Sequence, residues 1–233
     1  PLGPFVTTMA VAAGLILVVA ALDVTSVSLH PFYRRRPAAA FAVRRGANVA
    51  EPYHYQESTD LSTHGTTGED LPQFVFACAA AVTGTDKPAP GLSAYSYTMS
   101  ADHIGGPEFG YLPTKAAAST CSPRLRRDLT VQAAMATSGA AFASSMGRQG
   151  RWYQKLLALS GARLGTWLPN PEFVREVRAA DQDEREAGGG LFHRGRDRSV
   201  PLRFPLFRGV SYLYREVLGC NHRGARLLQV TDG

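Results

Sequence analysis

Apolar residues in this chain are grouped in a few long runs. The first run, Phe5–Leu22, carries no charge and would rise about 27 Å as a helix, close to the hydrocarbon thickness of a bilayer. It predicts a transmembrane helix within residues 1–24, with a buried core helix as the alternative. A signal peptide is disfavoured because a basic leader and a clear small-residue cleavage site are both missing.

Arginines follow this first run closely. They form the clusters Arg34–Arg36 and Arg44-Arg45, and positive charge beside an apolar span indicates the cytoplasmic side. Residues 37–45 are predicted to form a short amphipathic helix on an anionic surface. We expect residues 25–70 to be a basic juxtamembrane segment and linker, in which residues 46–70 form a polar loop. The expected location is the cell membrane, with the catalytic part cytoplasmic.

Residues 71–233 mix candidate strands and helices, which predicts an α/β domain. The apolar run Phe74–Val82 indicates a fully buried central strand. The alternating run Ala94–Ser100 indicates a second strand, antiparallel or near an edge, broken by Gly105-Gly106-Pro107. Asp128–Ser138 is predicted to be a helix with Asp128 as N-cap. Further expectations are a helix over 151–159 ending near Gly161, a turn over 167–171, a mobile insertion over 176–199, a helix over 211–218 and a strand over 226–230.

Composition narrows the function classes. The chain has 233 residues, 45% of them apolar, which suffices for one sizeable core, and a net charge of +6. Its basic clusters lack aromatic interleaving, zinc spacing and a recognition-helix pattern, so a nucleic-acid partner is disfavoured. The three cysteines, Cys78, Cys121 and Cys220, are odd in number and widely spaced. They argue against a disulfide framework and fit a reducing compartment.

The chain stops at Thr231-Asp232-Gly233, directly after an apolar strand-like run. Asp-Gly at this place indicates a turn that holds the Asp232 carboxylate at the carboxyl end of the strand, where α/β enzymes place catalytic groups. Because the chain also starts at Pro1 instead of Met, we interpret it as an internal piece of a longer protein. An ordinary turn aspartate is the alternative, since Asp-Gly is a common turn pair.

Two segments in order carry a resemblance: Ala136-Thr137-Ser138-Gly139-Ala140-Ala141, and later Val230-Thr231-Asp232-Gly233. The sequence resembles the patatin-like phospholipase family, in particular its bacterial, actinobacterial-type, membrane-linked members. The resemblance covers most of the chain, and the order of the motifs is stronger evidence than any one of them. The supporting segments are Ser28–Arg34, Phe74–Ala77, Ser100–Gly105 and Leu164–Pro171.

This resemblance implies a three-layer α/β sandwich with a central mixed sheet, incomplete here, and a Ser-Asp dyad. The serine of a Gly-x-Ser-x-Gly elbow attacks a lipid acyl ester, the aspartate takes its proton, and backbone N–H groups hold the oxyanion. By position Asp232 is the dyad aspartate. The nucleophile and the oxyanion loop lie N-terminal to this chain in the family, so the chain alone should be inactive. No metal or organic cofactor is implied, and the expected partners are the lipid substrate and a membrane.

The alternative is a non-catalytic membrane-associated scaffold or a degenerate homologue.

The other candidate residues are interpreted as structural. Ser138 lacks the glycine two residues before it that a nucleophile elbow needs, so a small-residue packing role is favoured. Asp102-His103 is interpreted as a hydrogen-bonded loop pair. Cys220-Asn221-His222 has no second pair at zinc spacing and is interpreted as structural. A basic nucleic-acid-binding module would instead show strongly salt-dependent binding.

Overall fold

The computed structural model describes residues 3–21, 23–54, 57–65, 72–83, 88–90, 92, 94–140, 155–156, 159–186 and 208–232. Within these residues one six-stranded sheet has the order β6-β5-β4-β3-β8-β7, and a separate hairpin pairs β1 with β2. The strands are β1 (Val43–Arg45), β2 (Ala50–Pro52), β3 (Val75–Ala81), β4 (Tyr95–Ser100), β5 (His103–Gly106), β6 (Gly110–Pro113), β7 (Thr166–Pro169) and β8 (Leu227–Thr231). The helices are α1 (Gly3–Ala21), α2 (His30–Phe41), η1 (Leu61–Thr63), α3 (Thr114–Thr120), α4 (Pro123–Arg126), α5 (Val131–Ser138), α7 (Pro171–Glu186) and α9 (Arg208–Leu218).

The expected mixture of helices and strands is confirmed, but the expected mixed sheet is wrong for the described strands. Every pairing among them is antiparallel. Strand β3 is also less buried than predicted, since Val75 and Ala77 are exposed and only its second half is covered. The reason is the short pairing with β8, which reaches only Ala79–Ala81.

The strands β4, β5 and β6 form a meander. β4 is the predicted second strand, and its antiparallel pairing is confirmed. Gly105 and Gly106 do not break the strand pattern as expected, because they lie within β5. Gly105 has φ +135°, and a Cβ there would lie 3.1 Å from the Pro171 ring. Glycine therefore lets β5 pass close to its neighbours at a backbone conformation that L side chains rarely adopt.

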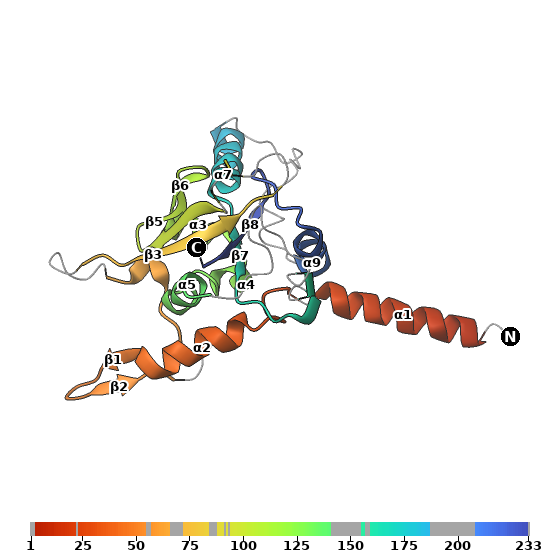
Figure 1. The fold of residues 1–233 in the computed structure, drawn as a ribbon, viewed down its shortest axis with the longest axis horizontal. Helices are drawn as coiled ribbons and strands as arrows, with labels where there is room; N and C mark the ends of the chain where they lie inside the picture. Colours follow the sequence, from red (N-terminus) through yellow and green to blue (C-terminus); the bar gives the residue numbers. More distant parts are fainter. Residues whose placement is uncertain are drawn as a thin grey trace.

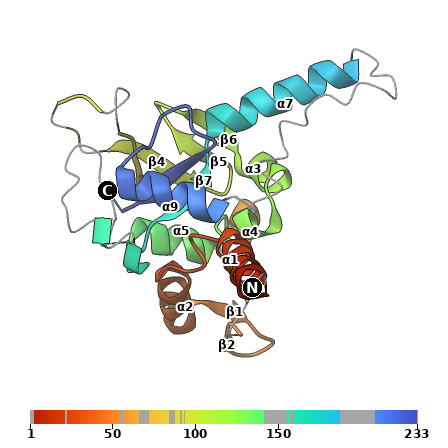
Figure 2. The same cartoon turned by 90° about the vertical axis from the view of Figure 1, so that its right-hand side faces the viewer.

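Helices cover the sheet in successive layers. Figure 1 shows α5 against the sheet and α2 on the outer side of α5, and the view in Figure 2 agrees. α9 packs on β7 through Tyr212, whose ring centroid lies 4.8 Å from that of Trp167. The predicted turn over 167–171 is therefore wrong, because Trp167 belongs to a buried strand paired with β8.

Two predicted helix starts are wrong. α5 begins at Val131, and its N-cap is Thr130, whose side chain accepts from the Ala133 N–H. Asp128 is buried instead, with a carboxylate oxygen 3.6 Å from Arg34 Nη1. The helix predicted over 37–45 is α2, which begins earlier, with a proline in its first turn, and ends at Phe41 before β1.

Of the remaining predicted elements, two are confirmed and one is wrong. The helix predicted over 211–218 and the strand predicted over 226–230 are confirmed as α9 and β8. The predicted mobile insertion is wrong over 176–186, which is helical within α7. Residues 187–199, and most of the helix predicted over 151–159, lie outside the described residues.

The first apolar run is a helix, α1, as predicted. Figure 1 shows it projecting away from the rest of the chain. Among the described residues, no helix combines the length and the apolar character needed to cross a membrane, so the transmembrane helix expected within residues 1–24 is not found. Large side chains along α1 are nevertheless more than half exposed, namely Phe5, Val6, Met9, Val11, Leu15 and Val18.

A buried ion pair connects distant segments. Arg163 Nη1 lies 3.1 Å from Glu216 Oε2 of α9, and the two side chains are 3% and 0% exposed. Arg163 Nη2 also donates to the Val24 carbonyl oxygen at 2.6 Å. The Gln229 amide of β8 donates to Glu216 Oε1 at 3.1 Å, and Asn221 donates to Gln229 at 2.8 Å. Removing one charge from such a network leaves the other charge buried and uncompensated in a low-dielectric site.

Replacing Arg163 by Met should therefore lower the free energy of unfolding by about 3–5 kcal/mol. The matched control is Arg223→Met, which removes one member of an exposed pair in which Arg223 Nε lies 3.9 Å from Glu172 Oε2. This control should change the free energy by less than about 1 kcal/mol. Urea unfolding followed by circular dichroism measures both. Equal losses in the two variants would contradict the importance of burial.

His30, at the start of α2, is fully buried, and its Nδ1–H donates to the Leu164 carbonyl oxygen at 2.6 Å. Burial lowers the pKa of His30 below its usual 6.5, against the opposing charge of Asp128. The folded chain therefore holds a neutral imidazole, while the unfolded chain binds a proton once the pH falls below about 6.5. The contribution of His30 to stability is complete above that pH and is lost as the pH falls through it.

The slope of unfolding free energy against pH, measured between pH 7.5 and 5.5, should be smaller in His30→Gln by up to about 1.4 kcal/mol per pH unit, the value for one proton. Gln keeps a donor for the Leu164 carbonyl but does not titrate. His222→Gln, at an exposed position, controls for the exchange of histidine for glutamine itself. An unchanged slope in His30→Gln would show that this side chain is protonated equally in both states.

Candidate functional site

Asp232 follows an interior strand of the sheet. β8 lies between β3 and β7, and all five of its residues are buried. Asp232 comes directly after them, half-buried, at the carboxyl end of the strand. The buried residues of β8 hold this strand inside the sheet. The Asp232 carboxylate therefore lies at the carboxyl end of the strand, as the sequence predicts.

The end of α5 lies beside this carboxyl end. The Thr231 hydroxyl donates to the Ala140 carbonyl oxygen at 3.3 Å. The Ser138 hydroxyl donates to the Ala77 carbonyl oxygen of β3 at 2.7 Å. The two segments that carry the family resemblance, far apart in sequence, are therefore neighbours in space.

Cys78 of β3 shares the electrostatic environment of Asp232. Burial raises the pKa of the Cys78 thiol to about 12, and the Asp232 carboxylate adds to this rise. A thiol in this state stays protonated at neutral pH and is a poor nucleophile. Cys78 therefore serves the packing of β3. Its proximity to Asp232 could not be predicted from the sequence, because the register between β3 and β8 depends on long-range pairing.

The other sequence candidates lie elsewhere and make structural contacts. Asp102 accepts from the Gln73 amide at 2.6 Å, and the His103 N–H donates to Ser100 Oγ at 3.1 Å within the β4–β5 turn. The Cys220 thiol donates to the Leu218 carbonyl oxygen at 3.9 Å. In the described part of the chain, no three His, Cys, Asp or Glu side chains are grouped so that they could hold a metal ion.

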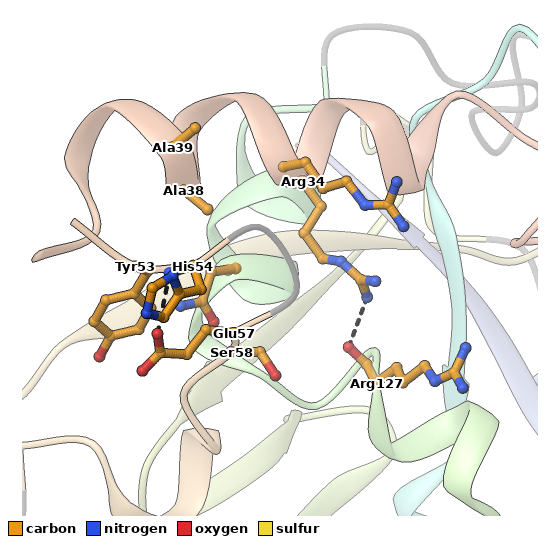
Figure 3. A pocket seen from close by; sticks show the side chains of 10 residues that line it. Arg34, Ala38, Ala39, Tyr53, His54, Glu57, Ser58 and Arg127 are labelled. Atoms are coloured by element: carbon orange, nitrogen blue, oxygen red, sulfur yellow. Dashed lines mark hydrogen bonds between the residues drawn. The ribbon is translucent and has the colours of Figure 1, made fainter.

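A hollow of about 470 Å³ lies between α2, the residues Tyr53, His54, Glu57 and Ser58, and the turn at Arg127 (Figure 3). Asp232 is not among its lining residues, which are Arg34, Arg35, Ala38, Ala39, Tyr53, His54, Glu57, Ser58, Arg127 and Gln132. The sequence shows two arginine clusters, 34–36 and 124–127, but nothing in it indicates that they meet. α2, which carries part of this lining, also contacts the end of α5, because the Tyr33 hydroxyl donates to the Gly139 carbonyl oxygen at 3.1 Å.

No protein-family model matches the chain, and no curated protein and no solved structure is significantly similar to it. The patatin-like resemblance therefore stays a prediction that rests on the order of the sequence motifs.

At pH 8, Cys78 should react with iodoacetamide at least about a thousandfold more slowly than a free thiol, since a pKa near 12 leaves about one part in ten thousand as thiolate. The half-buried Cys220 provides the comparison within the same chain. Peptide mass spectrometry distinguishes the cysteines. Alkylation of Cys78 at the rate of Cys220 in the folded chain would contradict the described burial of β3.

Proposed function

We propose that this chain is part of a membrane-associated patatin-like acyl hydrolase, in which Asp232 is the aspartate of a Ser-Asp dyad. The observation that carries the proposal is the place of Asp232, half-buried at the carboxyl end of the interior strand β8. The small-residue end of α5 lies next to it through Ala140 and Thr231. A carboxylate at the end of an interior strand is held by a rigid element, which is what positioning a proton acceptor requires.

In the proposed reaction the nucleophilic serine lies outside this chain. Its hydroxyl oxygen attacks the acyl carbon of a lipid ester while its proton passes to Asp232. Asp232 returns this proton to the leaving alcohol, and water then cleaves the acyl-serine to give the fatty acid and the free serine. For the fold, we propose a patatin-like sandwich. Helices packed on the six-stranded sheet and the adjacency of the two motif segments support it.

α1 and α2 support membrane association. The exposed apolar side chains of α1 would gain free energy on entering lipid, at about 25 cal/mol for each Å² removed from water. On α2, Phe32 is exposed and the Arg36 guanidinium lies 4.9 Å from its ring centroid. An aromatic ring with a cation beside it suits the headgroup region of a bilayer. In this proposal α1 contacts acyl chains and α2 contacts anionic headgroups.

The proposed dyad predicts that Asp232→Asn abolishes ester hydrolysis by the longer protein that contains this chain. The loss in kcat should be at least about 10²–10⁴-fold, because the serine loses its proton acceptor. Asp102→Asn is the control, since Asp102 accepts a hydrogen bond from Gln73 in a different part of the sheet. Hydrolysis of a p-nitrophenyl acyl ester and of phospholipid vesicles measures activity, and circular dichroism verifies folding.

Unchanged hydrolysis in Asp232→Asn would reduce Asp232 to a turn residue and remove the mechanism. A longer protein without hydrolase activity and without a Gly-x-Ser-x-Gly serine would favour the non-catalytic scaffold instead.

A further inference from the structure

Exposed apolar side chains gather on one side of the molecule. Among the described residues, most of the large apolar side chains that are exposed belong to residues 5–49. Beyond those of α1 they are Val27, Leu29, Phe32, Phe41, Val43 and Val49. Figures 1 and 2 both place α1, α2 and the β1–β2 hairpin along one side, with α7 on the opposite side. Apolar residues exposed together in this way mark a contact surface.

The β1–β2 hairpin turns its polar face toward the protein. Its register pairs Val43 with Pro52 and Arg44 with Glu51, so each pair lies on a different face. On the polar face, Arg44 Nε lies 3.3 Å from Glu51 Oε2, and Arg44 Nη1 lies 3.1 Å from Glu57 Oε1 in the segment after the hairpin. On the other face, Val43 is 58% exposed and Pro52 is also exposed. This is the reverse of a hairpin in water, whose polar face points to solvent.

The outer face of α2 has the same character. Leu29, Phe32 and Arg36 follow one another at spacings of three and four residues, so they share one face of the helix. Leu29 and Phe32 are 48% and 56% exposed, and Arg36 is exposed beside the Phe32 ring. On the opposite face His30 is buried and Tyr33 donates to the end of α5. α2 therefore presents an apolar stripe and a positive charge to solvent.

The positive charge of this segment lacks a matching negative charge. Residues 1–50 contain five arginines and one acidic residue, Asp23, which is buried. The next two carboxylates along the chain, Glu51 and Glu57, are both paired with Arg44. In a symmetric dimer the same surface would meet itself, and arginines would face arginines. An anionic lipid bilayer supplies both an apolar phase and negative charge.

We propose that the apolar face of the β1–β2 hairpin and the outer face of α2 dock on an anionic bilayer, on the same side as α1. The docking surface consists of the exposed apolar residues of α2 and the hairpin given above, together with Arg36. Val43 and Val49 enter the acyl boundary, Phe32 lies at headgroup level and Arg36 binds lipid phosphates. The inference specifies the surface behind the membrane association in the proposed function, on which it rests, and it is independent of Asp232.

The first test measures flotation of the full chain, diluted from a mild non-ionic detergent, with vesicles at about 0.15 M salt. Vesicles of phosphatidylcholine with phosphatidylglycerol should bind it better than phosphatidylcholine alone. The double variant Phe41→Ser, Val43→Asn should weaken binding about tenfold, because two apolar side chains no longer enter lipid. The matched control is Phe74→Ser, Val75→Asn: these side chains are 57% and 59% exposed but lie outside the docking surface. It should stay within about twofold of the unchanged chain.

The second test addresses the charge. Arg36→Gln should weaken binding to the anionic vesicles about fivefold and leave binding to phosphatidylcholine unchanged. Arg223→Gln removes the same charge at an exposed position next to Glu172 of α7, on the opposite side of the molecule, and should leave both unchanged. Circular dichroism verifies that each variant is folded.

Equal weakening by the two double variants, or no preference for anionic vesicles, would overturn the proposal. Binding that is lost in Leu15→Asn of α1 but kept in the hairpin variant would also overturn it, while leaving membrane association through α1 intact. Self-association without lipid that the hairpin variant abolishes, measured by sedimentation velocity, would assign the surface to a second copy instead. Hydrolysis of a soluble ester is measured without vesicles, so failure of the dyad and failure of the docking surface are recognised separately.

Discussion

The buried ion pair between Arg163 and Glu216 is the interaction on which the arrangement of this chain depends. It fixes α9 to the segment before β7, and the Arg163 guanidinium also holds the Val24 carbonyl between α1 and α2. Gln229 extends the network into β8. Burying two charges costs several kcal/mol each, and separating the pair would leave each charge buried without its partner. The network therefore favours one arrangement of these segments over looser ones.

The position of Asp232 and that of the proposed docking surface both depend on this arrangement. Gln229 is two residues from Thr231, so the register that satisfies the Gln229 amide also sets where β8 ends and where Asp232 emerges. Leu164, next to Arg163, accepts the hydrogen bond from His30 and so positions the start of α2. A single cluster near the β7–β8 edge thus determines the position of the carboxylate and of the helix that carries part of the docking surface.

The elements whose own residues show a clear pattern could be predicted from the sequence. α9 and β8 have clear apolar patterns, and the alternation of β4 is visible without any partner. The turn predicted over 167–171 was wrong because its prolines are strong local turn signals, whereas pairing with β8, far along the chain, makes Thr166–Pro169 a buried strand. Likewise, Asp128 fits an N-cap by sequence, but its ion pair with Arg34 and its burial could be seen only once α2 had been packed on α5. The hollow lined by Arg34 and Arg127 required the same long-range information.

The small-residue motif at the end of α5 has a packing explanation on both of its sides. A Cβ on Gly139 would lie 3.4 Å from the Tyr33 hydroxyl oxygen, which is van der Waals contact, so α2 packs directly against this position. On the sheet side, Ser138 and Ala140 hydrogen-bond to β3 and β8. Because the Ser138 hydroxyl donates to the Ala77 carbonyl oxygen of β3, this hydrogen bond holds α5 against the sheet. The motif therefore supports the proposed hydrolase by placing α5 beside β8, and the chemical part of that proposal depends on Asp232 alone.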